Sequence, residues 1–420
     1  MSQTLKTQMA IGLGLIVLMI LWSFNLPAKS VGFLISGLFI GYILTRSRFG
    51  FAGGVKRPYM TGDTALNEAL FFMFTITAVV VAAIHWHAAD GGAVLASLAK
   101  EGDKVIPGSQ SVRPLDLGVM IGGFLFGGGM IIAGGCASGT LTDLGEGAVR
   151  SLIALVFYII GSPIGHWMRV VYGKSENKIV NVSMYFPNSF GYVGSVALTA
   201  LLFLVLFYIV KGYSYKRKQA GTYIKPGYED IEKELDYDNA PFFSYATYHR
   251  FFIKRWSFMT GGILLALMFI FVLVSTGKTW GVTSAFTTWG VALFSRFGVD
   301  FAAIGGFDKE IKEAANLLAH NGTIRNIGII LGASISFLLA GRFTIDRDFK
   351  AKDAAWYALG GLLMGIGARF ARGCNVGALY SAITAFSLHG WGFLVFMTLG
   401  AIVFLKLSEG KLNIVPKRNV

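Results

Sequence analysis

The sequence is short of charged residues and of cysteine, and each shortage excludes a class of protein. Only 14% of its 420 residues are charged, against about a quarter in soluble domains. Two cysteines cannot form a disulfide framework. The chain also lacks a glycine-rich phosphate loop, a His-Glu-x-x-His motif and a thioredoxin-type Cys-x-x-Cys motif. We therefore expect no enzyme, no cofactor and no bound metal.

What the chain has in plenty is apolar residues and glycine. Hydrophobic residues make up 54% of the sequence, 54 residues are glycine, and the mean hydropathy is +0.60. Small residues let helices pack closely in lipid. The net charge of +14 is explained by basic cytoplasmic loops. We therefore expect a lipid bilayer, and no nucleic acid, among its partners.

Ten apolar segments approach the roughly 20 residues that a helix needs to cross a bilayer. They predict an all-α polytopic membrane protein with about ten transmembrane helices. The first segment ends near a sequence that resembles a signal-peptide cleavage site, but its apolar stretch exceeds the usual core of about 7–15 residues, so we keep it as a span. The segments are 8–27, 31–46, 66–88, 116–135, 151–172, 191–211, 257–275, 322–341, 355–373 and 388–407.

Positive charge in the loops predicts the orientation, because cytoplasmic loops carry an excess of Lys and Arg. With the N-terminus inside, the basic segments at 46–57, 211–218, 342–352 and 411–418 all fall on the cytoplasmic side. An even number of spans then places both termini in the cytoplasm.

Three segments outside the spans have a distinct character. The hydrophilic stretch 212–255 carries a basic cluster followed by an acidic one, and we interpret it as a cytoplasmic linker between two halves. A docking site for a soluble partner is the alternative. Segments 47–57 and 280–297 are apolar but too short or too broken to cross. They indicate short re-entrant helices that line a cavity.

The chain contains an internal repeat. The segment GFLFGGGMIIAGGCASGTL, which begins at Gly123, aligns with GLLMGIGARFARGCNVGAL, which begins at Gly361, at a constant offset of 238 residues. Both copies end in Gly-Cys-x-x-Gly, at Cys136 and Cys374. Because the chain has only two cysteines, chance does not easily produce this coincidence. We therefore interpret both cysteines as functional, and not as small buried apolar residues.

The two halves are predicted to be inverted in the membrane. Each half contains four spans, and corresponding spans lie five crossings apart, which is an odd number. Inverted repeats are typical of transporters, whose substrate site lies near the midplane at the repeat interface. The predicted division is an additional N-terminal helix at 1–30, a first half at 31–172, a connecting helix at 191–211, the linker at 212–255, a second half at 256–407 and a cytoplasmic tail at 408–420.

The residues around each cysteine favour contact with an anion, although helix packing alone remains an alternative role for the glycines. Each helix is predicted to break just after its cysteine, which exposes backbone N–H groups at the start of a half-helix. A thiol is a weak donor, so it can hold an anion without stalling its passage. The candidate substrate-binding residues are Cys136, Gly135, Gly139, Cys374, Gly373, Asn375 and Gly377.

In the predicted topology Cys136 lies at the cytoplasmic end of its helix and Cys374 at the external end of the equivalent helix. The two thiols would then mark two points on one permeation path. They would also be too distant for a disulfide, which needs its Cα atoms within about 7 Å of each other.

Charge distinguishes the two halves. Arg369 and Arg372 precede Cys374 three residues apart, so both lie near one helix face. Their repeat equivalents are Ile131 and Gly134. Arginine within a span is costly and by default functional, so we predict a cationic outer mouth and a neutral inner one, suited to capturing an external anion. Snorkelling of both arginines to the lipid phosphates is the alternative.

The histidines give weaker indications. His389 lies at the start of the last span and is predicted to be a polar group of the vestibule. His85 and His87 face different ways on one helix, which favours interfacial positions over metal ligation. His166 is interpreted as a packed core residue.

With both cysteine motifs in view, the chain resembles the YeeE/YedE family of bacterial inner-membrane sulfur-compound transporters. The motifs that carry the resemblance are AGGCASG around Cys136 and GARFARGCNVGALYSAITAFSLHGW around Cys374, with FGFAGG and TWGVTSAFTTWG in support. The resemblance covers both halves but not the linker. The second motif is similar to the YedE branch, which is associated with selenium metabolism.

The resemblance implies an hourglass-shaped inverted repeat that imports thiosulfate or a related anion. It assigns the S–H contacts with that anion to Cys136 and Cys374. Thiosulfate-importing members carry a further cysteine in a re-entrant segment, where this chain has Gly50. The resemblance therefore implies a small sulfur- or selenium-containing anion as the substrate, and a small cytoplasmic sulfur-carrier protein as a partner.

Three hypotheses follow. The leading one is an inner-membrane transporter that passes its anion along the two thiols. The second is a membrane-embedded sulfurtransferase that forms a persulfide on one cysteine, which mass spectrometry would detect. The third is a structural or assembly protein, which would carry no flux and leaves the repeat unexplained.

Overall fold

The polypeptide is almost entirely helical. The computed structural model describes residues 3–175, 179–225, 227, 229–237 and 240–418. Within these residues, nine helices are long and apolar enough to cross a membrane. The prediction of an all-α polytopic membrane protein is confirmed.

The chain forms both long and short helices, together with two short strands. The long helices are α1 (Gln3–Ser23), α2 (Ala28–Ser47), α4 (Ala65–Asp90), α5 (Leu117–Ala133), α7 (Val149–Lys174), α8 (Phe186–Gln219), α10 (Phe258–Thr276), α14 (Asn321–Leu339), α15 (Ala351–Phe370) and α17 (Leu388–Ser408). The shorter helices are α3 (Gly53–Thr61), α6 (Ala137–Gly145), α9 (Tyr245–Tyr248), α11 (Thr283–Arg296), α12 (Phe301–Ile304), α13 (Asp308–Ala314) and α16 (Ser381–Thr384). Single turns of other helix types are η1 (Ser109–Ser111), η2 (Asp230–Glu232), η3 (His249–Ile253), η4 (Leu317–Ala319) and η5 (Asn375–Tyr380), and two short strands, β1 (Leu115–Asp116) and β2 (Asn181–Val182), pair antiparallel.

All ten predicted spans correspond to long helices, but one of these helices is more polar than the rest. The segment predicted at 355–373 is α15, which is not among the nine helices that are apolar enough to cross. This helix carries Lys352, Asp353 and Arg369, which lower its hydropathy. It is nevertheless surrounded by protein, because α5 and α7 both pack against it.

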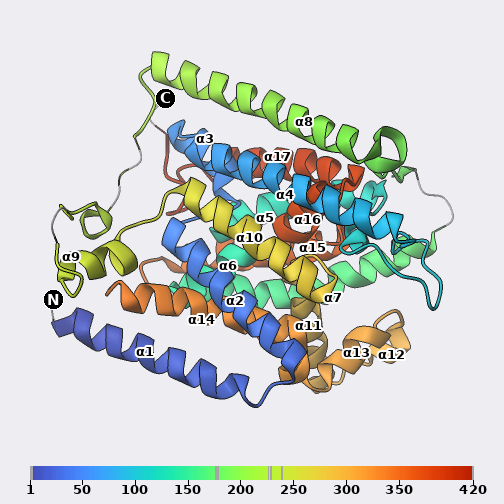
Figure 1. The fold of residues 1–420 in the computed structure, drawn as a ribbon, viewed down its shortest axis with the longest axis horizontal. Helices are drawn as coiled ribbons and strands as arrows, with labels where there is room; N and C mark the ends of the chain where they lie inside the picture. The colour runs from blue at the N-terminus through green and yellow to red at the C-terminus, as the bar shows by residue number, and fades with distance from the viewer. Residues whose placement is uncertain (1–2, 176–178, 226, 228, 238–239, 419–420) are drawn as a thin grey trace.

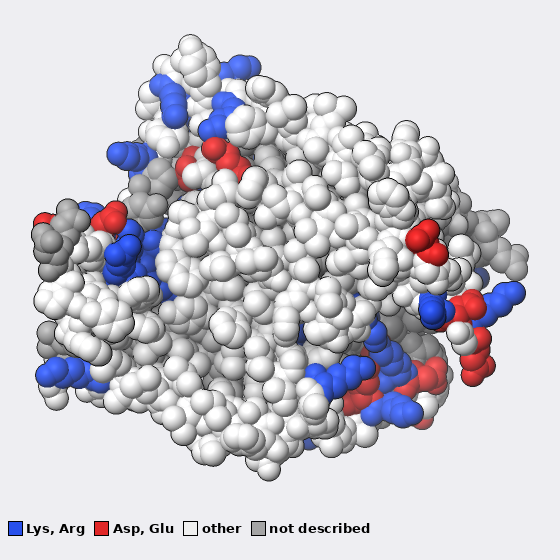
Figure 2. Space-filling model, viewed as in Figure 1, with Lys and Arg blue, Asp and Glu red and all other residues white. Residues whose placement is uncertain are grey.

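The molecule has two charged ends and an apolar middle. In Figure 1 the long helices run roughly along the horizontal axis, and both termini lie at the left end. Figure 2 shows Lys, Arg, Asp and Glu gathered at the left and right ends, with a broad band of other residues between them. Side chains of α8 within that band, such as Leu201 and Val205, are exposed. A band of exposed apolar side chains between charged ends is what a bilayer requires.

The two halves pack on each other in the same way twice. A Cβ added to Gly365 on α15 would overlap the carbonyl oxygen of Tyr158 on α7. A Cβ added to Gly127 on α5 would likewise overlap the carbonyl oxygen of Met397 on α17. Gly127 and Gly365 are equivalent in the repeat, so α7 packs on α15 as α17 packs on α5. The pairs α2 with α14 and α4 with α10 form a second such set.

Equivalent helices run in opposite directions. Gly122 near the start of α5 lies against Ala371 just after α15, whereas Gly129 near the end of α5 lies against Gly360 in the first half of α15. The two helices are therefore antiparallel, as an inverted repeat requires. The division of the chain into the predicted segments stays a prediction, which this reciprocal packing supports.

The connecting helix is longer than the predicted 191–211. The structure extends α8 to Gln219, after a break in the helical conformation at Gly191, where φ is 63°. The last turns of α8 are held by the segment around α3: Ser214 donates a hydrogen bond of 2.7 Å to the carbonyl of Gly62, and Arg217 donates one of 2.9 Å to that of Tyr59. Part of the predicted linker is therefore helix.

The contact between α7 and α15 predicts a strong effect of a single methyl group. We expect Gly365→Ala to lower the stability of the protein in detergent by about 1–3 kcal/mol, because the new methyl would overlap backbone atoms that cannot move aside. Thermal unfolding measures the difference. Gly14→Ala on α1 is the matched control, since no atom lies within 4 Å of its added Cβ. Equal melting temperatures for the two variants would contradict the prediction.

Candidate functional site

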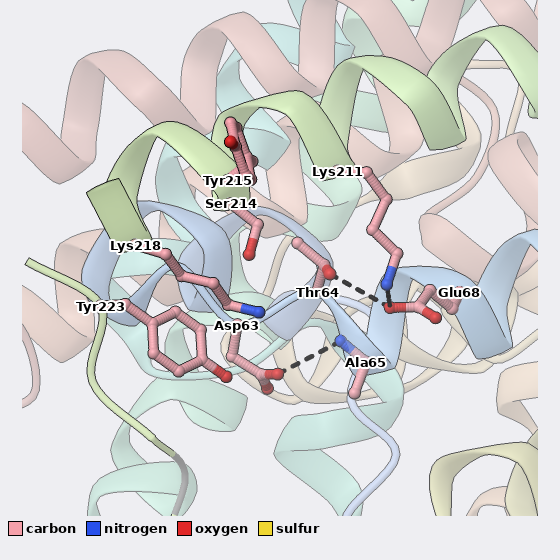
Figure 3. Close-up of a pocket in the computed structure, with 9 residues that line it drawn as sticks. All are labelled: Asp63, Thr64, Ala65, Glu68, Lys211, Ser214, Tyr215, Lys218 and Tyr223. Carbon is pink, nitrogen blue, oxygen red and sulfur yellow. Dashed lines mark hydrogen bonds and ion pairs between the residues drawn. The ribbon is translucent and has the colours of Figure 1, made fainter. Parts of the chain in front are cut away.

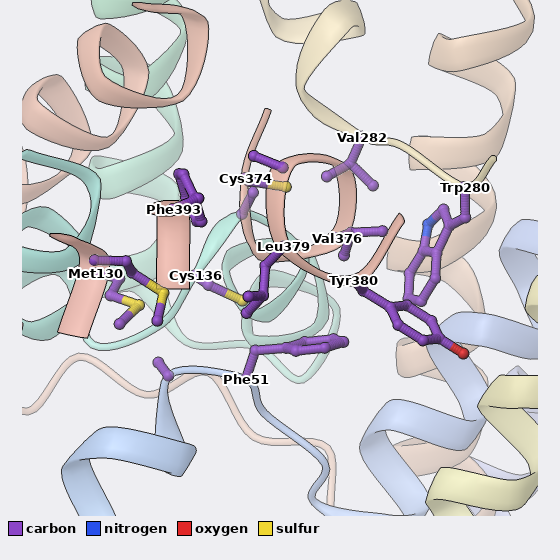
Figure 4. Close-up of a cluster of buried hydrophobic side chains, with 14 of the residues drawn as sticks. Phe51, Met130, Cys136, Trp280, Val282, Cys374, Val376, Leu379, Tyr380 and Phe393 are labelled. Atoms are coloured by element: carbon purple, nitrogen blue, oxygen red, sulfur yellow. The ribbon is translucent and has the colours of Figure 1, made fainter. Parts of the chain in front are cut away.

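Both cysteines lie deep in the molecule, next to the ends of the antiparallel helices α5 and α15. Cys136 and Cys374 are each 1% exposed and each has a free thiol. They occupy the N-cap positions of α6 and η5. Both belong to one contiguous cluster of buried side chains, where Figure 4 shows them close to Met130 and Leu379. The two halves of the chain therefore bring their cysteines into the same core.

The chain changes direction before each cysteine, and not after it as predicted. Gly134 ends α5 with φ at 91°, and its equivalent Arg372 lies just beyond α15 with φ at 64°. A left-handed residue at this position ends a helix, because it turns the following N–H groups back toward the last carbonyls. Each cysteine consequently begins the next short helix instead of ending the previous one.

Hydrogen-bonding groups of the backbone and of side chains lie next to both cysteines. The backbone N–H groups of Gly377 and Val376 point at the Cys374 sulfur. Asn375 directs its Nδ2 to the Met130 sulfur at 3.5 Å, while its Oδ1 has no partner among the described residues. On the other side, Cys136 Sγ lies 3.4 Å from the Ser138 hydroxyl. Of the predicted glycines, Gly135 and Gly373 lie in the turns just before the cysteines, and Gly139 lies in α6.

Arg372 adopts a conformation that disfavours its side chain. A non-glycine residue in the left-handed region costs roughly 1–2 kcal/mol, and the equivalent position in the first half is Gly134. Residues held in such conformations cluster at functional sites. The sequence pattern predicted a role for Arg372 from its charge, and the backbone conformation is an independent reason to expect one.

Arg369 contacts an acidic segment that is predicted to be external. Its Nη2 lies 3.2 Å from His166 Nδ1 and 3.9 Å from a carboxylate oxygen of Glu310. Glu310 belongs to α13, which packs on α11 through a small separate apolar cluster that contains Phe301 and Phe307. Arg369 therefore faces other protein side chains, which argues against its snorkelling to lipid phosphate.

Arg372 lies in a second group of charges, close to the start of α5. The carbonyl of Arg372 accepts a hydrogen bond from Arg113, and the charges of Arg169 and Asp116 also act on its guanidinium. Asp116 is the acid of this group and is engaged by Arg169, at 2.9 and 2.6 Å to its two oxygens. These four residues therefore leave a net positive charge on the predicted outer side.

Charged residues lie near Cys136 in balanced number, since Arg150 and Lys56 face Asp143 and Asp346, and the neutral inner mouth stays a prediction. Arg150 on α7 lies against Gly134, beside Cys136, and pairs with Asp143 at 2.8 Å. Lys56 on the re-entrant helix α3 is close to both charges, and burial together with the Arg150 charge lowers its pKa to about 8. Sequence comparison of the two repeats missed these cations because they come from other helices than the one that carries the cysteine.

The acidic part of the linker binds the predicted cytoplasmic side of the membrane domain. Arg342, which follows α14, pairs with Glu229 and Glu232, and Arg48 at the end of α2 lies 3.6 Å from Glu232. Arg48 also pairs with Glu146 at the end of α6, at 3.1 Å. The linker therefore lies next to the segment that follows Cys136, whether or not a soluble partner also docks there.

Five of the six histidines are buried or paired, and His87 is exposed. His389 is fully buried, with Nδ1 3.4 Å from the Pro114 carbonyl, so the structure does not expose it to an open vestibule. His85 is buried between Tyr185 and Pro107. Within the described residues, no group of three or more His, Cys, Asp or Glu is placed to hold a metal.

Gly50, where the resemblance expects a further cysteine, has room for a side chain. No described atom lies within 4 Å of a Cβ added there. Its neighbours Phe49 and Phe51 belong to the same core cluster as the two cysteines. The place where a thiol is expected is therefore open, and no described side chain fills it.

An open pocket of about 440 Å³ lies elsewhere, between the start of α4 and the end of α8 (Figure 3). Its charged residues already pair, with Lys211 Nζ 2.6 Å from Glu68. None of the residues that line it belongs to the core cluster around the cysteines. The candidate site is therefore located by the thiols, the arginines and the symmetry of the repeat, and not by the size of a pocket.

Comparison with known proteins agrees with this location. A family model described as sulphur transport matches residues 46–403, which include both cysteines and both arginines. The thiosulfate transporter TsuA of Escherichia coli (strain K12) is 26% identical over 373 residues, covering 87% of this chain and 91% of that protein. TsuA of Spirochaeta thermophila is 25% identical over 384 residues, covering 87% and 95%. The probable transporter YedE of E. coli (strain K12) is 30% identical over 153 residues, covering 36% and 38%.

The Asp116–Arg169 pair predicts a pH-dependent contribution to stability. Burial raises the pKa of the Asp116 carboxyl, but the hydrogen bonds and charge of Arg169 outweigh it and leave the pKa lowered. The pair therefore stabilises the fold above the ordinary aspartate pKa of about 3.9, and this stabilisation is lost as the pH falls through the lower folded value.

We expect Asp116→Asn to cost about 3–5 kcal/mol near neutral pH, because it leaves Arg169 without its charge partner while an amide oxygen can still cap α5. Thermal unfolding of both proteins across the acidic range measures the effect. The difference should shrink below about pH 3.9. Asp230→Asn, which removes an exposed carboxylate, is the control and should change nothing measurable. A constant difference at every pH would refute the assignment.

Proposed function

The chain belongs to the sulphur transport family, and from that premise we propose that it imports a small sulfur- or selenium-containing anion across the bacterial inner membrane. The observation that carries the proposal is the pair of buried thiols, one from each half, in a core whose two faces both present cations. A multi-pass helical protein with this arrangement is suited to an anion path. Both termini lie at one end of the molecule (Figure 1), which supports placing both in the cytoplasm.

Capture would take place at Arg369 and Arg372 on the outer side. Arg372 presents its guanidinium among charges that are mostly positive, which attracts an anion. Arg369 is paired with Glu310, so an arriving anion would compete with that carboxylate for the same cation. Arg369 and Arg372 precede Cys374 by five and two residues, so a captured anion would already lie near the first thiol.

Passage would use weak donors. The S–H groups of Cys374 and Cys136 are weak donors that can contact an anion without holding it tightly, and the backbone N–H groups of Val376 and Gly377 lie beside Cys374. Conduction requires binding that is favourable enough for entry and weak enough for release. Lys56 and Arg150, on the inner side of Cys136, would then draw the anion toward the cytoplasm.

The identity of the anion is part of the proposal. The relatives named thiosulfate transporters support a sulfur anion, and Gly50 leaves one thiol fewer than the resemblance expects. We therefore propose a thiosulfate-like sulfur anion or its selenium analogue. A small cytoplasmic sulfur-carrier protein would receive it at the inner face, where Arg48 and Arg342 bind the carboxylates of the linker.

The first test removes each thiol in turn. In liposomes that contain the purified protein, we expect Cys136→Ala and Cys374→Ala each to lower the uptake of labelled thiosulfate or selenite by about ten-fold or more, the size of a lost hydrogen bond to a charged group. Wild-type uptake in both variants would overturn the thiol path. Mass spectrometry of the wild type after turnover should find unmodified thiols, and a persulfide on either cysteine would indicate the sulfurtransferase instead.

The second test separates stability from function at Arg372. We expect Arg372→Gly to keep or raise the melting temperature, because glycine adopts the left-handed conformation without strain. Uptake should nevertheless fall, with the loss largest at low ionic strength, where long-range attraction is strongest. Arg372→Lys restores the charge and should recover part of the uptake. If Arg372→Gly transports at the wild-type rate, the arginine has no part in capture.

A further inference from the structure

One polar side chain in the cysteine core is not explained by packing. Tyr158 on α7 is fully buried, and its hydroxyl has no hydrogen-bond partner among the residues that the structure describes. Its ring packs against Phe286 at 4.8 Å between centroids. A phenylalanine would fill the same space, so the hydroxyl is an addition that packing does not require.

The hydroxyl faces the proposed path. Tyr158 belongs to the same buried cluster as Cys136 and Cys374, and its backbone lies against Gly365 in the helix that leads to Cys374. The hydroxyl is within electrostatic range of both cysteine sulfurs and of the Arg369 guanidinium. It therefore lies near both thiols and near Arg369.

Other buried tyrosines in this chain satisfy their hydroxyls. Tyr357 bonds to Asn413 at 2.5 Å, and Tyr380 to Thr77 at 2.7 Å. A buried hydroxyl without a partner is unfavourable, because it has lost its bonds to water and gained none. The exception at Tyr158 therefore calls for a ligand that is not part of the protein.

The repeat shows that the hydroxyl is specific to one half. The residue of α17 that packs on α5 as Tyr158 packs on α15 is Met397, which is apolar. The duplicated architecture therefore does not need a polar group there. The Asn375 amide, next to Cys374 in the chain, also has an oxygen, Oδ1, without a partner in the described part of the chain.

We propose that Tyr158 donates a hydrogen bond to an oxygen atom of the transported anion while the thiols contact its sulfur or selenium. The inference rests on the proposed function and makes it more specific, because it requires a substrate with an oxygen acceptor. An oxyanion such as thiosulfate or selenite satisfies it, whereas hydrosulfide, which has no oxygen, does not.

The test is Tyr158→Phe in liposomes, with uptake of labelled thiosulfate and of hydrosulfide measured side by side. We expect thiosulfate uptake to fall by about ten-fold, which corresponds to about 1.4 kcal/mol, while hydrosulfide uptake keeps its wild-type value. The melting temperature should stay the same or rise, because the variant removes an unpaired buried hydroxyl. Tyr357→Phe is the matched control: it loses a satisfied hydroxyl and should lower the melting temperature without changing uptake.

The outcomes separate the two proposals. If Tyr158→Phe moves thiosulfate as well as the wild type does, the role of the hydroxyl is overturned and the proposed function is left intact. An equal loss for both anions also overturns it, because oxygen recognition would then not be the cause. A wild-type protein that carries no sulfur or selenium anion at all overturns the proposed function, and the inference about Tyr158 with it.

Discussion

Close contact between helix backbones is the constraint on which the rest of this structure depends. Lipid gives helices no hydrophobic reason to associate, so the contact itself must stabilise them. At Gly127 and Gly365 a neighbouring carbonyl occupies the space that a Cβ would need. These contacts lock α5, α7, α15 and α17 into one block. The positions of both cysteines follow, because Cys136 lies three residues after the end of α5 and Cys374 lies four residues after the end of α15.

The antiparallel pair α5 and α15 explains how two distant cysteines share one core. Each helix ends at a left-handed residue, after which the chain turns back into the protein. Backbone groups inside a membrane must be satisfied by the protein itself. The carbonyls of Cys136 and Cys374 each accept an N–H four residues ahead, at 2.7 Å in both halves. The duplicated turn is therefore stable at membrane depth, and both thiols stay buried without being bonded to each other.

Much of this arrangement could be predicted from the sequence, because apolar length and the repeated Gly-Cys-x-x-Gly are local patterns. The positions of the ten long helices, including α15, followed from them. The inner cations Lys56 and Arg150 could not be predicted, since they reach Cys136 from helices outside the aligned segment. Tyr158 was missed for a similar reason: whether a hydroxyl has a partner depends on all its neighbours in space.

A duplicated fold supplies two equivalent environments, and a path with a direction needs them to differ. Two differences between the halves fall at equivalent positions. Arg372 replaces Gly134 in the same left-handed conformation, at a cost in backbone strain. Tyr158 stands where the other half has Met397, at the cost of an unpaired hydroxyl. Since the other half packs without either feature, binding of an anion from one side is the simplest reason for both exceptions.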